Sequence, residues 1–490
     1  MRKHVSVAEV VKHNKAEDLW IVVNDHVYDM TEFTPTHPGG AEVIIRYAGS
    51  DASAAYNEVH SPSLIQVKLD ATKHIGPLDT SDTTSQLVIK DAAEISEVQQ
   101  DKSPKLEDII NLDDFERSAK TTLSKKGWAF INGGTNDNIT RDANNGLLRR
   151  IWLRPSILRD VKNVNTRSNL FGCNLSIPIF ISPTGGAKMG GAEGELTLAK
   201  SAAAQGVVHC FATPSSYPHN EILDVTPKQA FFQLYVNKDR KASETAIRQA
   251  DATGKIKAIF VTVDVPVVPK RDDDERVKAE STQVTLGNGA GKKRDKKGAG
   301  LARQSSNFID SGFHWKDIRW LRSITDKPIV IKGIQRASDA RLANQYGADG
   351  IIVSNHGGRA ADTAPPAILT LLELHKNCPE VFEKMEVLID GGFRRGGDVV
   401  KAICLGASAV GIGRSFLYAL QFGQEGVEHA IEILRDEIET TMRLCGMTNL
   451  MQDASPDFIN TNDIDHLVPS WKHPYAIKHT KVVSSAKARL

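Results

Sequence analysis

A histidine and an arginine stand three residues apart at the end of an apolar run, and their side chains suit one chemistry. The run Ile351-Ile352-Val353 is followed by Ser354-Asn355-His356-Gly357-Gly358-Arg359. Histidine exchanges protons near neutral pH, and arginine binds a carboxylate through two parallel hydrogen bonds. The oxidation of a 2-hydroxy acid requires a base beside such an anion-binding group. The alternative is an ordinary strand followed by a solvated turn.

The β-branched run before this motif predicts a buried parallel strand, and similar runs recur along the chain. Eight of them alternate with helical stretches, which is typical of an α/β fold, the (β/α)₈ TIM barrel. A doubly wound sheet is the rival fold, but no Gly-x-Gly-x-x-Gly follows the first strand. The predicted strands are 178–182, 208–213, 231–236, 258–265, 328–333, 350–355, 387–391 and 409–413.

Polar residues collect at the ends of the predicted strands, where barrel enzymes place their active sites. Two glycine-rich turns with arginines follow the last two strands, at residues 390–396 and 411–414. Barrels often bind a phosphate at this position, so we expect a phosphate site there rather than two ordinary glycine turns. The polar residues at the strand ends are Gln233, Tyr235, Thr262, Asp264, Arg271, Lys332, His356, Arg359, Asp390, Arg394 and Arg414.

A compact α+β unit is predicted for residues 1–78. Two short strands flank an Asn-Asp turn in residues 20–29, and a helical stretch begins at Ala41. His37 lies in His-Pro-Gly-Gly, and His60 follows 23 positions later. A lone histidine is usually a surface or core residue, but two that flank short helices are able to bind a haem iron from opposite sides.

The remaining boundaries follow from composition. Residues 79–104 are rich in Ser, Thr and Asp and then in Gln and Glu, which is typical of a linker. Residues 105–475 are expected to form the barrel domain, which opens on a stretch of helical spacing at 106–126. A Gly- and Lys-rich insertion at 272–313 is predicted to be a mobile loop. Residues 476–490 are expected to be a C-terminal tail.

Composition and charge narrow the class of protein. The chain has 490 residues, of which 40% are hydrophobic and 25% charged, so we expect a globular protein of two to three domains. No apolar run reaches the length of a membrane span, and the five cysteines form no metal or disulfide pattern. Nothing in the charge pattern indicates a nucleic-acid partner.

The net charge of +1 is unevenly distributed. Residues 1–108 contain 18 acidic and 10 basic side chains and carry −8, so the remaining residues carry +9. Such an acidic end is able to attract a basic partner, for example a small electron carrier. The alternative is that the two parts of the chain merely complement each other.

Two parts of the sequence resemble known protein families. Residues 4–78 resemble a cytochrome b5-type haem domain, which implies haem b bound by His37 and His60. Residues 105–450 resemble the FMN-dependent 2-hydroxy acid oxidase and dehydrogenase family, and the order of the two domains is similar to that of flavocytochrome b2 enzymes, L-lactate dehydrogenases that use cytochrome c. The motifs behind the second resemblance are Ser354-Asn355-His356-Gly357-Gly358-Arg359, Gln233-Leu234-Tyr235-Val236, Thr262-Val263-Asp264, Ile331-Lys332-Gly333 and Asp390-Gly391-Gly392.

The resemblance implies a role for each matching residue. Arg359 and Arg271 would bind the substrate carboxylate, Tyr235 its hydroxyl group, and His356 would take a proton with Asp264 orienting it. The residues that would contact the flavin ring are Gln233, Thr262, Ala212 and Lys332, the last of which would stabilise the reduced flavin. Those that would hold the ribityl chain and phosphate are Asp390, Gly391, Gly392, Arg394, Gly413 and Arg414.

The sequence departs from the family at several positions. Trp128-Ala129-Phe130-Ile131 stands where the family usually has paired tyrosines. The first of them, here Phe130, normally helps to bind the substrate carboxylate and aids electron transfer from flavin to haem. Ala360-Ala361-Asp362 replaces Gln-Leu-Asp, and Ala212 and Pro214 replace Ser and Leu. These changes predict a substrate whose side chain differs from that of lactate.

We therefore expect an enzyme that oxidises an L-2-hydroxy acid, lactate or a relative, with FMN and passes electrons through haem b to an acceptor such as cytochrome c. An FMN-dependent oxidase that uses O₂ is the alternative, and a sensor with a drifted site is a third hypothesis. The resemblance also implies a homotetramer. The C-terminal Ala488-Arg489-Leu490 is a variant of the peroxisomal address, whereas cytoplasm and mitochondrial intermembrane space are the alternatives.

Overall fold

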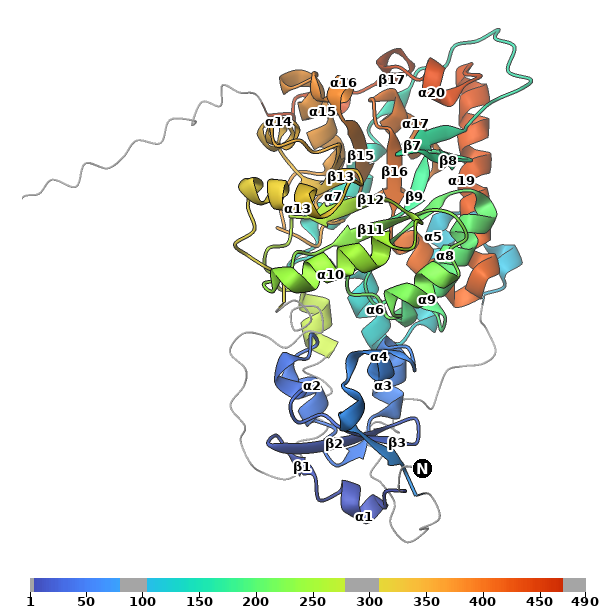
Figure 1. Ribbon diagram of the computed structural model, residues 1–490. Helices are drawn as coiled ribbons and strands as arrows, with labels where there is room; N and C mark the ends of the chain where they lie inside the picture. The colour runs from blue at the N-terminus through green and yellow to red at the C-terminus, as the bar shows by residue number, and fades with distance from the viewer. Residues whose placement is uncertain (1–3, 80–103, 278–307, 470–490) are drawn as a thin grey trace, which may run out of the picture.

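The computed structural model describes residues 4–79, 104–277 and 308–469. A small N-terminal domain, blue in Figure 1, lies against one end of a larger barrel domain. The linker, the centre of the insertion predicted at 272–313, the tail predicted at 476–490 and its terminal tripeptide all fall outside the described residues.

Eight parallel strands close into a barrel in the order β10-β11-β12-β13-β14-β15-β16-β9. The TIM barrel prediction is therefore confirmed, and each predicted strand is present with small differences at its ends. The sixth strand, for example, ends at Val353 rather than 355, because the chain turns there and Gly358 N–H donates to the carbonyl of Asn355. The strands are β9 Ile179–Ile181, β10 Val208–Ala212, β11 Ala230–Leu234, β12 Ile256–Thr262, β13 Ile329–Ile334, β14 Gly350–Val353, β15 Glu386–Asp390 and β16 Ala409–Ile412.

Apolar side chains fill the barrel at the amino-terminal end of its strands. Phe180, Phe231 and Phe260 are buried there, and the hairpin β7 Ser168–Leu170 and β8 Cys173–Leu175 packs against them. The outer face of the strands packs against the helices. These helices are α8 Gly194–Gln205, α9 His219–Asp224, α10 Arg240–Asp251, α13 Ile318–Ile324, α14 Ala337–Gln345, α15 Ala367–Asn377, α16 Val381–Lys384, α17 Gly396–Cys404, α18 Arg414–Ala419 and α19 Gly423–Cys445.

The helical stretch expected at 106–126 is divided. Its parts are η3 Leu106–Asp108, α5 Leu112–Thr122 and the start of α6 Lys125–Asn132. Asn111 and Ser124 cap α5 and α6, since their side chains accept hydrogen bonds from the main chain at 2.9 and 3.0 Å. The remaining elements of the barrel domain are α7 Ile139–Leu148, β6 Trp152–Leu153, α20 Leu450–Asp453, β17 Ile459–Asn460 and α21 Asn462–Asp465.

The N-terminal domain is a mixed sheet with short helices, as predicted. Asn24 and Asp25 have φ of 50° and 60°, the conformation of a two-residue hairpin turn, and they connect β2 to β3. The elements are α1 Val7–Val10, β1 Asn14–Lys15, β2 Asp18–Val23, β3 His26–Asp29, α2 Ala41–Ile45, β4 Ser50–Asp51, α3 Ser53–Val59, α4 Leu64–Lys68 and β5 His74–Pro77.

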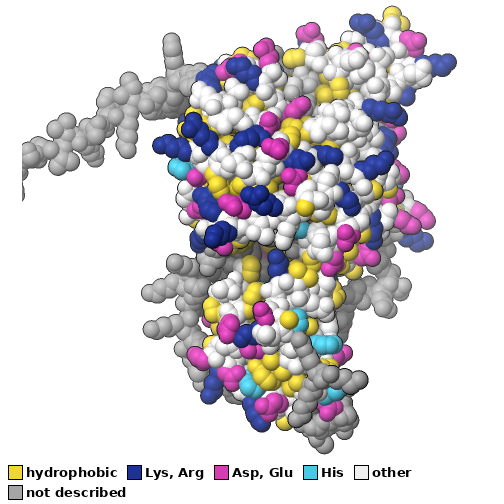
Figure 2. Space-filling model, viewed as in Figure 1, with side chains coloured by type: hydrophobic (Ala, Val, Ile, Leu, Met, Phe, Trp, Pro, Cys, Tyr) yellow, Lys and Arg dark blue, Asp and Glu magenta, His cyan; other side chains and the backbone are white. Residues whose placement is uncertain are grey.

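The N-terminal domain meets the barrel through its helical end. Figure 1 places α3 and α4 next to the barrel domain near α6, and α3 packs against the short helix η4 Ala187–Met189. Figure 2 shows a narrow waist between the two domains, and on this face acidic and basic side chains are interspersed. Within the described ranges, no helix combines the length and the apolar character needed to cross a lipid bilayer.

Candidate active site

A cavity of about 780 Å³ opens at the carboxyl ends of the barrel strands. Its volume is within the range of small-molecule and cofactor sites. Asp264 lies behind His356 and is absent from the lining. The predicted site residues that line the cavity are Phe130, Ala212, Gln233, Tyr235, Thr262, Arg271, Lys332, His356, Arg359, Asp390, Gly391, Gly392, Arg394, Gly413 and Arg414.

The predicted base and its orienting carboxylate are in direct contact. Nδ1 of His356 lies 2.9 Å from Oδ1 of Asp264, whose side chain has no exposed surface. Burial by itself raises the pKa of Asp264, but the positive charges of His356 and Lys332 outweigh it and lower that pKa. An ionised Asp264 accepts a hydrogen bond from the Nδ1–H group, so the Nε2 lone pair of a neutral His356 is available to a substrate.

The other side of His356 meets a tyrosine. Oη of Tyr235 lies 3.4 Å from Nε2 of His356. Burial, with the nearby charge of Asp264, raises the pKa of Tyr235 to about 12, so its phenol stays protonated and is able to donate a hydrogen bond. Burial also lowers the pKa of His356, an effect that Asp264 partly offsets. The site therefore combines an unprotonated base with a hydroxyl donor.

The turn that carries His356 is held in a strained conformation. His356 has φ of 59°, which is uncommon for a residue with a side chain. Its N–H donates to Oγ of Ser354 at 3.0 Å, and the N–H of Gly358 donates to Oδ1 of Asn355 at 3.0 Å. The buried Asn355 also pairs with Asn144 of α7. The Ser and Asn of the motif thus shape the turn, a role that the sequence reasoning did not assign.

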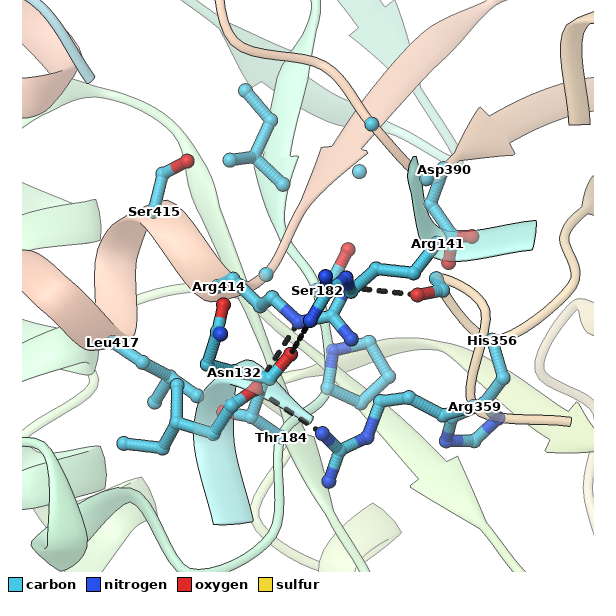
Figure 3. Close-up of a pocket in the computed structure, with 18 of the residues that line it drawn as sticks. Asn132, Arg141, Ser182, Thr184, His356, Arg359, Asp390, Arg414, Ser415 and Leu417 are labelled. Atoms are coloured by element: carbon cyan, nitrogen blue, oxygen red, sulfur yellow. Dashed lines mark hydrogen bonds between the residues drawn. The ribbon is translucent and has the colours of Figure 1, made fainter. Parts of the chain in front are cut away.

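Two guanidinium groups, those of the half-buried Arg359 and the buried Arg271, line the cavity together with His356. Nη1 of Arg359 donates to the carbonyls of Phe130 and Gly133 at 2.8 and 2.7 Å. Arg271 is buried, and its Nε has no hydrogen-bond partner among the described residues. Figure 3 shows Arg359 beside His356, and Arg414 in the same cavity. An incoming carboxylate would satisfy Arg271 and neutralise the excess positive charge.

A fixed cation lies in the wall of the cavity. Nζ of Lys332 lies 3.1 Å from Oδ2 of Asp390 and 3.0 Å from Oγ of Ser354. Burial alone would lower the pKa of Lys332, but the charges of Asp390 and Asp264 raise it above its usual value. Lys332 therefore remains charged, and its position is suited to stabilise a developing negative charge.

The rest of the cavity fits FMN. Oγ of Ser182 and Oγ1 of Thr184 are buried without a hydrogen-bond partner in the described ranges, and both residues line the cavity. A Cβ atom at Gly411 would lie 2.5 Å from Oγ of Ser182, so only glycine permits this close packing. A planar ring with hydrogen-bonding edges would satisfy the unpartnered hydroxyls. Ser182 and Thr184 were not predicted as site residues, although the polar Ser-Pro-Thr at the end of the first strand was a usable signal.

The predicted phosphate end of the cavity has the required groups. Gly391 and Gly392 have φ of 100° and 87°, so the chain after β15 turns as only glycine does readily. Arg394 donates to Glu116 and, at 3.2 Å, to Oγ of Ser415. Arg414 lines the same region, and the main chain after β15 and β16 leads into α17 and α18, whose amino ends favour anions.

The two predicted haem ligands face each other in the N-terminal domain. The ring centres of His37 and His60 are 6.2 Å apart at an interplanar angle of 81°. Two imidazoles on one iron require about 6 Å, since each metal–nitrogen bond is about 2 Å and each ring centre lies about 1 Å further. Nδ1 of His37 lies 3.2 Å from the carbonyl of Gly40, which directs Nε2 towards the iron site.

The electrostatics of the histidine pair also suit a metal. Burial lowers the pKa of both side chains, that of His60 to about 4 with His37 contributing. Metals bind neutral imidazole, so these histidines need no deprotonation to become ligands. The pair therefore fits haem b.

The residues that depart from the family pattern do not all reach the cavity. Phe130, Ala212 and Pro214 line it, whereas Ala360 and Ala361 do not. Ala360 is buried, and its carbonyl accepts a hydrogen bond from Thr135 at 2.7 Å. The change after Arg359 thus acts on packing beside α6 rather than on direct contact with a substrate.

Comparison with known proteins gives a family match for each of the two domains. A model of the FMN-dependent dehydrogenase family matches residues 119–461, and a model of the cytochrome b5-like heme/steroid binding domain matches residues 6–79. An L-lactate dehydrogenase (cytochrome) of Wickerhamomyces anomalus is 40% identical over 461 residues, which are 93% of this chain and 79% of that protein. The corresponding enzyme of Saccharomyces cerevisiae is 40% identical over 482 residues, with 94% and 80% covered.

Two further comparisons concern the barrel domain. A peroxisomal (S)-2-hydroxyacid oxidase of Arabidopsis thaliana is 40% identical over 361 residues, which are 73% of this chain and 98% of the relative. The solved flavin-binding domain of baker's yeast flavocytochrome b2 has 36% sequence identity and a TM-score of 0.67, and the match covers 79% of this chain and 96% of that domain. FMN and haem are thus its cofactors, as the motifs predicted. The chain belongs to the FMN-dependent dehydrogenase family and carries a cytochrome b5-like domain at its N-terminus.

Proposed function

We propose that the enzyme oxidises an L-2-hydroxy acid to the 2-oxo acid and passes the electrons through haem b to an external acceptor. The observation that carries this proposal is the His356–Asp264 pair beside Arg271 and Arg359, at a cavity of about 780 Å³ whose lining fits FMN. When bound, FMN supplies a two-electron acceptor and haem b a one-electron relay.

Each residue has a task in this reaction. Arg271 and Arg359 bind the substrate carboxylate and thereby orient the carbinol carbon. Tyr235 donates a hydrogen bond to the substrate hydroxyl, and Nε2 of His356 accepts a proton from the substrate. The Asp264 carboxylate stabilises the imidazolium that forms, and the Lys332 cation stabilises negative charge that develops in the cavity.

The substrate is proposed to differ from lactate in its side chain. Phe130 lines the cavity but lacks a hydroxyl group that could bind a carboxylate. Ala212 and Pro214, which replace the family's usual Ser and Leu, also line the cavity and change the shape of its wall. The test is a screen of flavin bleaching, without oxygen, over glycolate, L-lactate, L-mandelate and longer L-2-hydroxy acids. A kcat/KM for L-lactate far above that of all the others would refute this part of the proposal.

An oxidase that delivers electrons to O₂ is the second candidate. The 40% identity to the Arabidopsis (S)-2-hydroxyacid oxidase favours it. Stopped-flow mixing with substrate separates the two functions. Rapid haem reduction that follows flavin reduction supports the haem relay, whereas flavin reoxidation by O₂ with haem still oxidised supports the oxidase.

We propose cytochrome c as the external acceptor. The excess of acidic residues in the first 108 residues would attract a basic carrier, and two relatives are named L-lactate dehydrogenase (cytochrome). The expected result is a rate of cytochrome c reduction that falls steeply as ionic strength rises, because exposed charges are screened.

We further propose a homotetramer assembled through the barrel domain. Ile157, Leu158 and Leu444 are 79%, 98% and 69% exposed, and they lie together because Ser156 N–H donates to the carbonyl of Cys445 at 3.0 Å. Exposed apolar groups of this kind often mark protein contacts. Light scattering should give four chains per particle, and fewer for Leu158→Asp.

A peroxisomal location is proposed from the terminal Ala488-Arg489-Leu490. A fluorescent protein fused ahead of the full chain should enter peroxisomes, and removal of the last three residues should leave it outside. A mitochondrial or cytoplasmic signal from the intact fusion would contradict this location.

A further inference from the structure

The segment that carries His60 is bound to the barrel domain through its main chain. Nζ of Lys188 donates to the carbonyl of His60 at 3.1 Å, and the N–H of Ser61 donates to the carbonyl of Ser216 at 3.0 Å. Ser61 has no exposed surface, so this contact is closed to water. The segment of the haem ligand His60 is thus fixed by contacts with two loops of the barrel domain.

An ion pair next to these contacts supports the same docking. Oε2 of Glu58 lies 2.9 Å from Nζ of Lys126, and its Oε1 accepts a hydrogen bond from Ser124 at 3.0 Å. Glu58 belongs to α3, which ends immediately before His60, and Lys126 belongs to α6. The docked segment therefore lies beside the helix that also carries Phe130 in the cavity wall.

The two loops that hold this segment also form the wall of the flavin cavity. Lys188 lies in η4, three residues after Gly185 in the lining, and Ser216 lies two residues after Pro214 in the lining. One hydrogen bond and a short run of covalent bonds thus connect the cavity wall to His60.

A buried carboxyl group ties the two loops together. Oε1 of Glu195 accepts hydrogen bonds from the N–H groups of Ser216 at 2.8 Å and Ala187 at 3.2 Å, and Glu195 has no exposed surface. The N–H of Lys188 also donates to Oγ of Ser216 at 3.3 Å. The spacing between the two contacts of the His60 segment is therefore set by Glu195.

We propose that Lys188 is a positioning residue for electron transfer between the domains: it binds the His60 carbonyl and docks the haem-ligand segment on the loops of the flavin cavity, with Glu195 fixing both loops. This inference rests on the proposed function. With both cofactors bound, the two electrons of reduced FMN would pass one at a time to ferric haem, the external acceptor would take each electron in turn, and the protons of reduced FMN would be released to solvent.

The charge of Lys188 should also affect the midpoint potential of the haem. A positive charge near the iron favours the ferrous state, because reduction removes positive charge from the haem. Lys188→Met removes this charge and the hydrogen bond to His60, and it keeps an unbranched side chain. The haem midpoint potential of the variant should therefore be lower than that of the wild-type enzyme.

The test uses the full-length holoenzyme and compares Lys188→Met with Lys188→Arg. Lys200→Met is the matched control. Lys200 lies in α8 and forms an ion pair with Glu193, the residue that precedes this helix. Hydrogen exchange at the Ser61 amide reports docking without turnover, and stopped-flow measurements separate flavin reduction from haem reduction. A lost hydrogen bond to a charged donor should raise Ser61 exchange and slow flavin-to-haem transfer by about tenfold or more.

We expect Lys188→Met to slow haem reduction but not flavin reduction. Flavin reduction by substrate should stay within about twofold of wild type in Lys188→Met, whereas Lys188→Arg and Lys200→Met should retain Ser61 protection and haem reduction. Unchanged Ser61 exchange and haem reduction in Lys188→Met would overturn the inference. So would an equal slowing of flavin and haem reduction, which would indicate a general structural defect.

Glu195 provides an independent variant pair. Glu195→Gln keeps an oxygen that accepts from Ser216 and Ala187, whereas Glu195→Met removes it. We expect Glu195→Gln to resemble wild type and Glu195→Met to resemble Lys188→Met in Ser61 exchange. Identical behaviour of the two variants would contradict the assigned role. If no 2-hydroxy acid bleaches the flavin, the proposed function fails, but the Ser61 exchange comparison still tests the docking.

Discussion

Nδ1 of His356 lies 2.9 Å from Oδ1 of Asp264, and that carboxylate has no contact with solvent. His356 follows β14 and Asp264 follows β12, so the barrel brings the two together although they are 92 residues apart in the chain. Because Asp264 accepts a hydrogen bond from the Nδ1–H group, the imidazole presents Nε2 to the cavity as an acceptor. Several consequences of this pairing are measurable.

Replacement of Asp264 should impair His356 as a base without releasing FMN from the cavity. In Asp264→Asn the imidazolium that forms during proton transfer loses its counter-charge and its orienting acceptor. We expect the rate of flavin reduction by substrate to fall by about 10²–10⁴-fold. The matched control is Asp273→Asn, whose carboxylate is half-exposed and pairs with Arg276. A rate equal to that of the control would show that Asp264 does not assist His356.

The pH dependence of flavin reduction should follow the protonation of His356. Burial lowers the pKa of His356 below its usual 6.5, and only the neutral form accepts a proton. The rate constant should therefore be constant above pH 6.5 and decrease as the pH falls through the lowered pKa. Since Asp264 raises the pKa of His356, the decrease should begin at a lower pH in Asp264→Asn. A rate that rises on acidification would contradict the assignment of His356 as the base.

Arg271 should act on substrate binding more than on the chemical step. Its Nε has no partner among the described residues, and its charge is buried beside that of Arg359. Arg271→Lys keeps the charge but loses the planar pair of donors, so KM for the hydroxy acid should rise by about 10–100-fold. Saturation of flavin reduction with substrate measures this change. The control Arg276→Lys, at an exposed site, should leave KM unchanged.

The barrel and most of its site were predictable, because strand ends are marked by local sequence. Apolar β-branched runs locate the strands, and closure of eight parallel strands brings their polar ends to one rim. Residues at those ends, such as Lys332 and His356, could thus be assigned to one cavity before their contacts were known. The haem ligands were equally predictable, since His37 and His60 stand in the short, distinctive motifs His-Pro-Gly-Gly and Glu-Val-His-Ser-Pro.

Contacts between distant segments were not predictable from the chain alone. Glu195 occupies an unremarkable position in α8, yet it joins two loops because the barrel folds them over its carboxyl group. The contact between Lys188 and His60 depends on how two domains pack, for which the sequence contains no local signal. Ala360 and Ala361 were expected at the pocket but lie outside its lining, since the turn after His356 carries them away from it.

Loss of either predicted haem ligand, His37 or His60, should abolish haem binding and spare the flavin reaction. The ring centres of His37 and His60 are 6.2 Å apart, and each would supply one nitrogen ligand to the iron. His37→Ala should lose the Soret absorbance of the purified enzyme, while the flavin remains reducible by substrate. His26→Gln, at an exposed histidine of the same domain, is the control. Retained bis-histidine haem spectra in His37→Ala would refute the ligand assignment.

His209 should make the barrel domain sensitive to acid. It is buried in β10, and neither ring nitrogen has a hydrogen-bond partner among the described residues. Burial lowers the pKa of His209 to about 3. Between pH 6.5 and 3 the unfolded chain therefore binds a proton that the folded chain does not, so the free energy of unfolding decreases as the pH falls.

The magnitude of this effect can be isolated with His209→Leu, which has no titrating group. Between pH 7.5 and pH 5 the wild-type protein should lose about 2 kcal/mol more than this variant, because one pKa unit corresponds to about 1.4 kcal/mol. Urea unfolding followed by fluorescence at the two pH values gives the difference. His26→Gln, which removes an exposed histidine, should follow the wild-type trend. Parallel pH dependence of wild type and His209→Leu would show that His209 is protonated as readily in the folded barrel as in the unfolded chain.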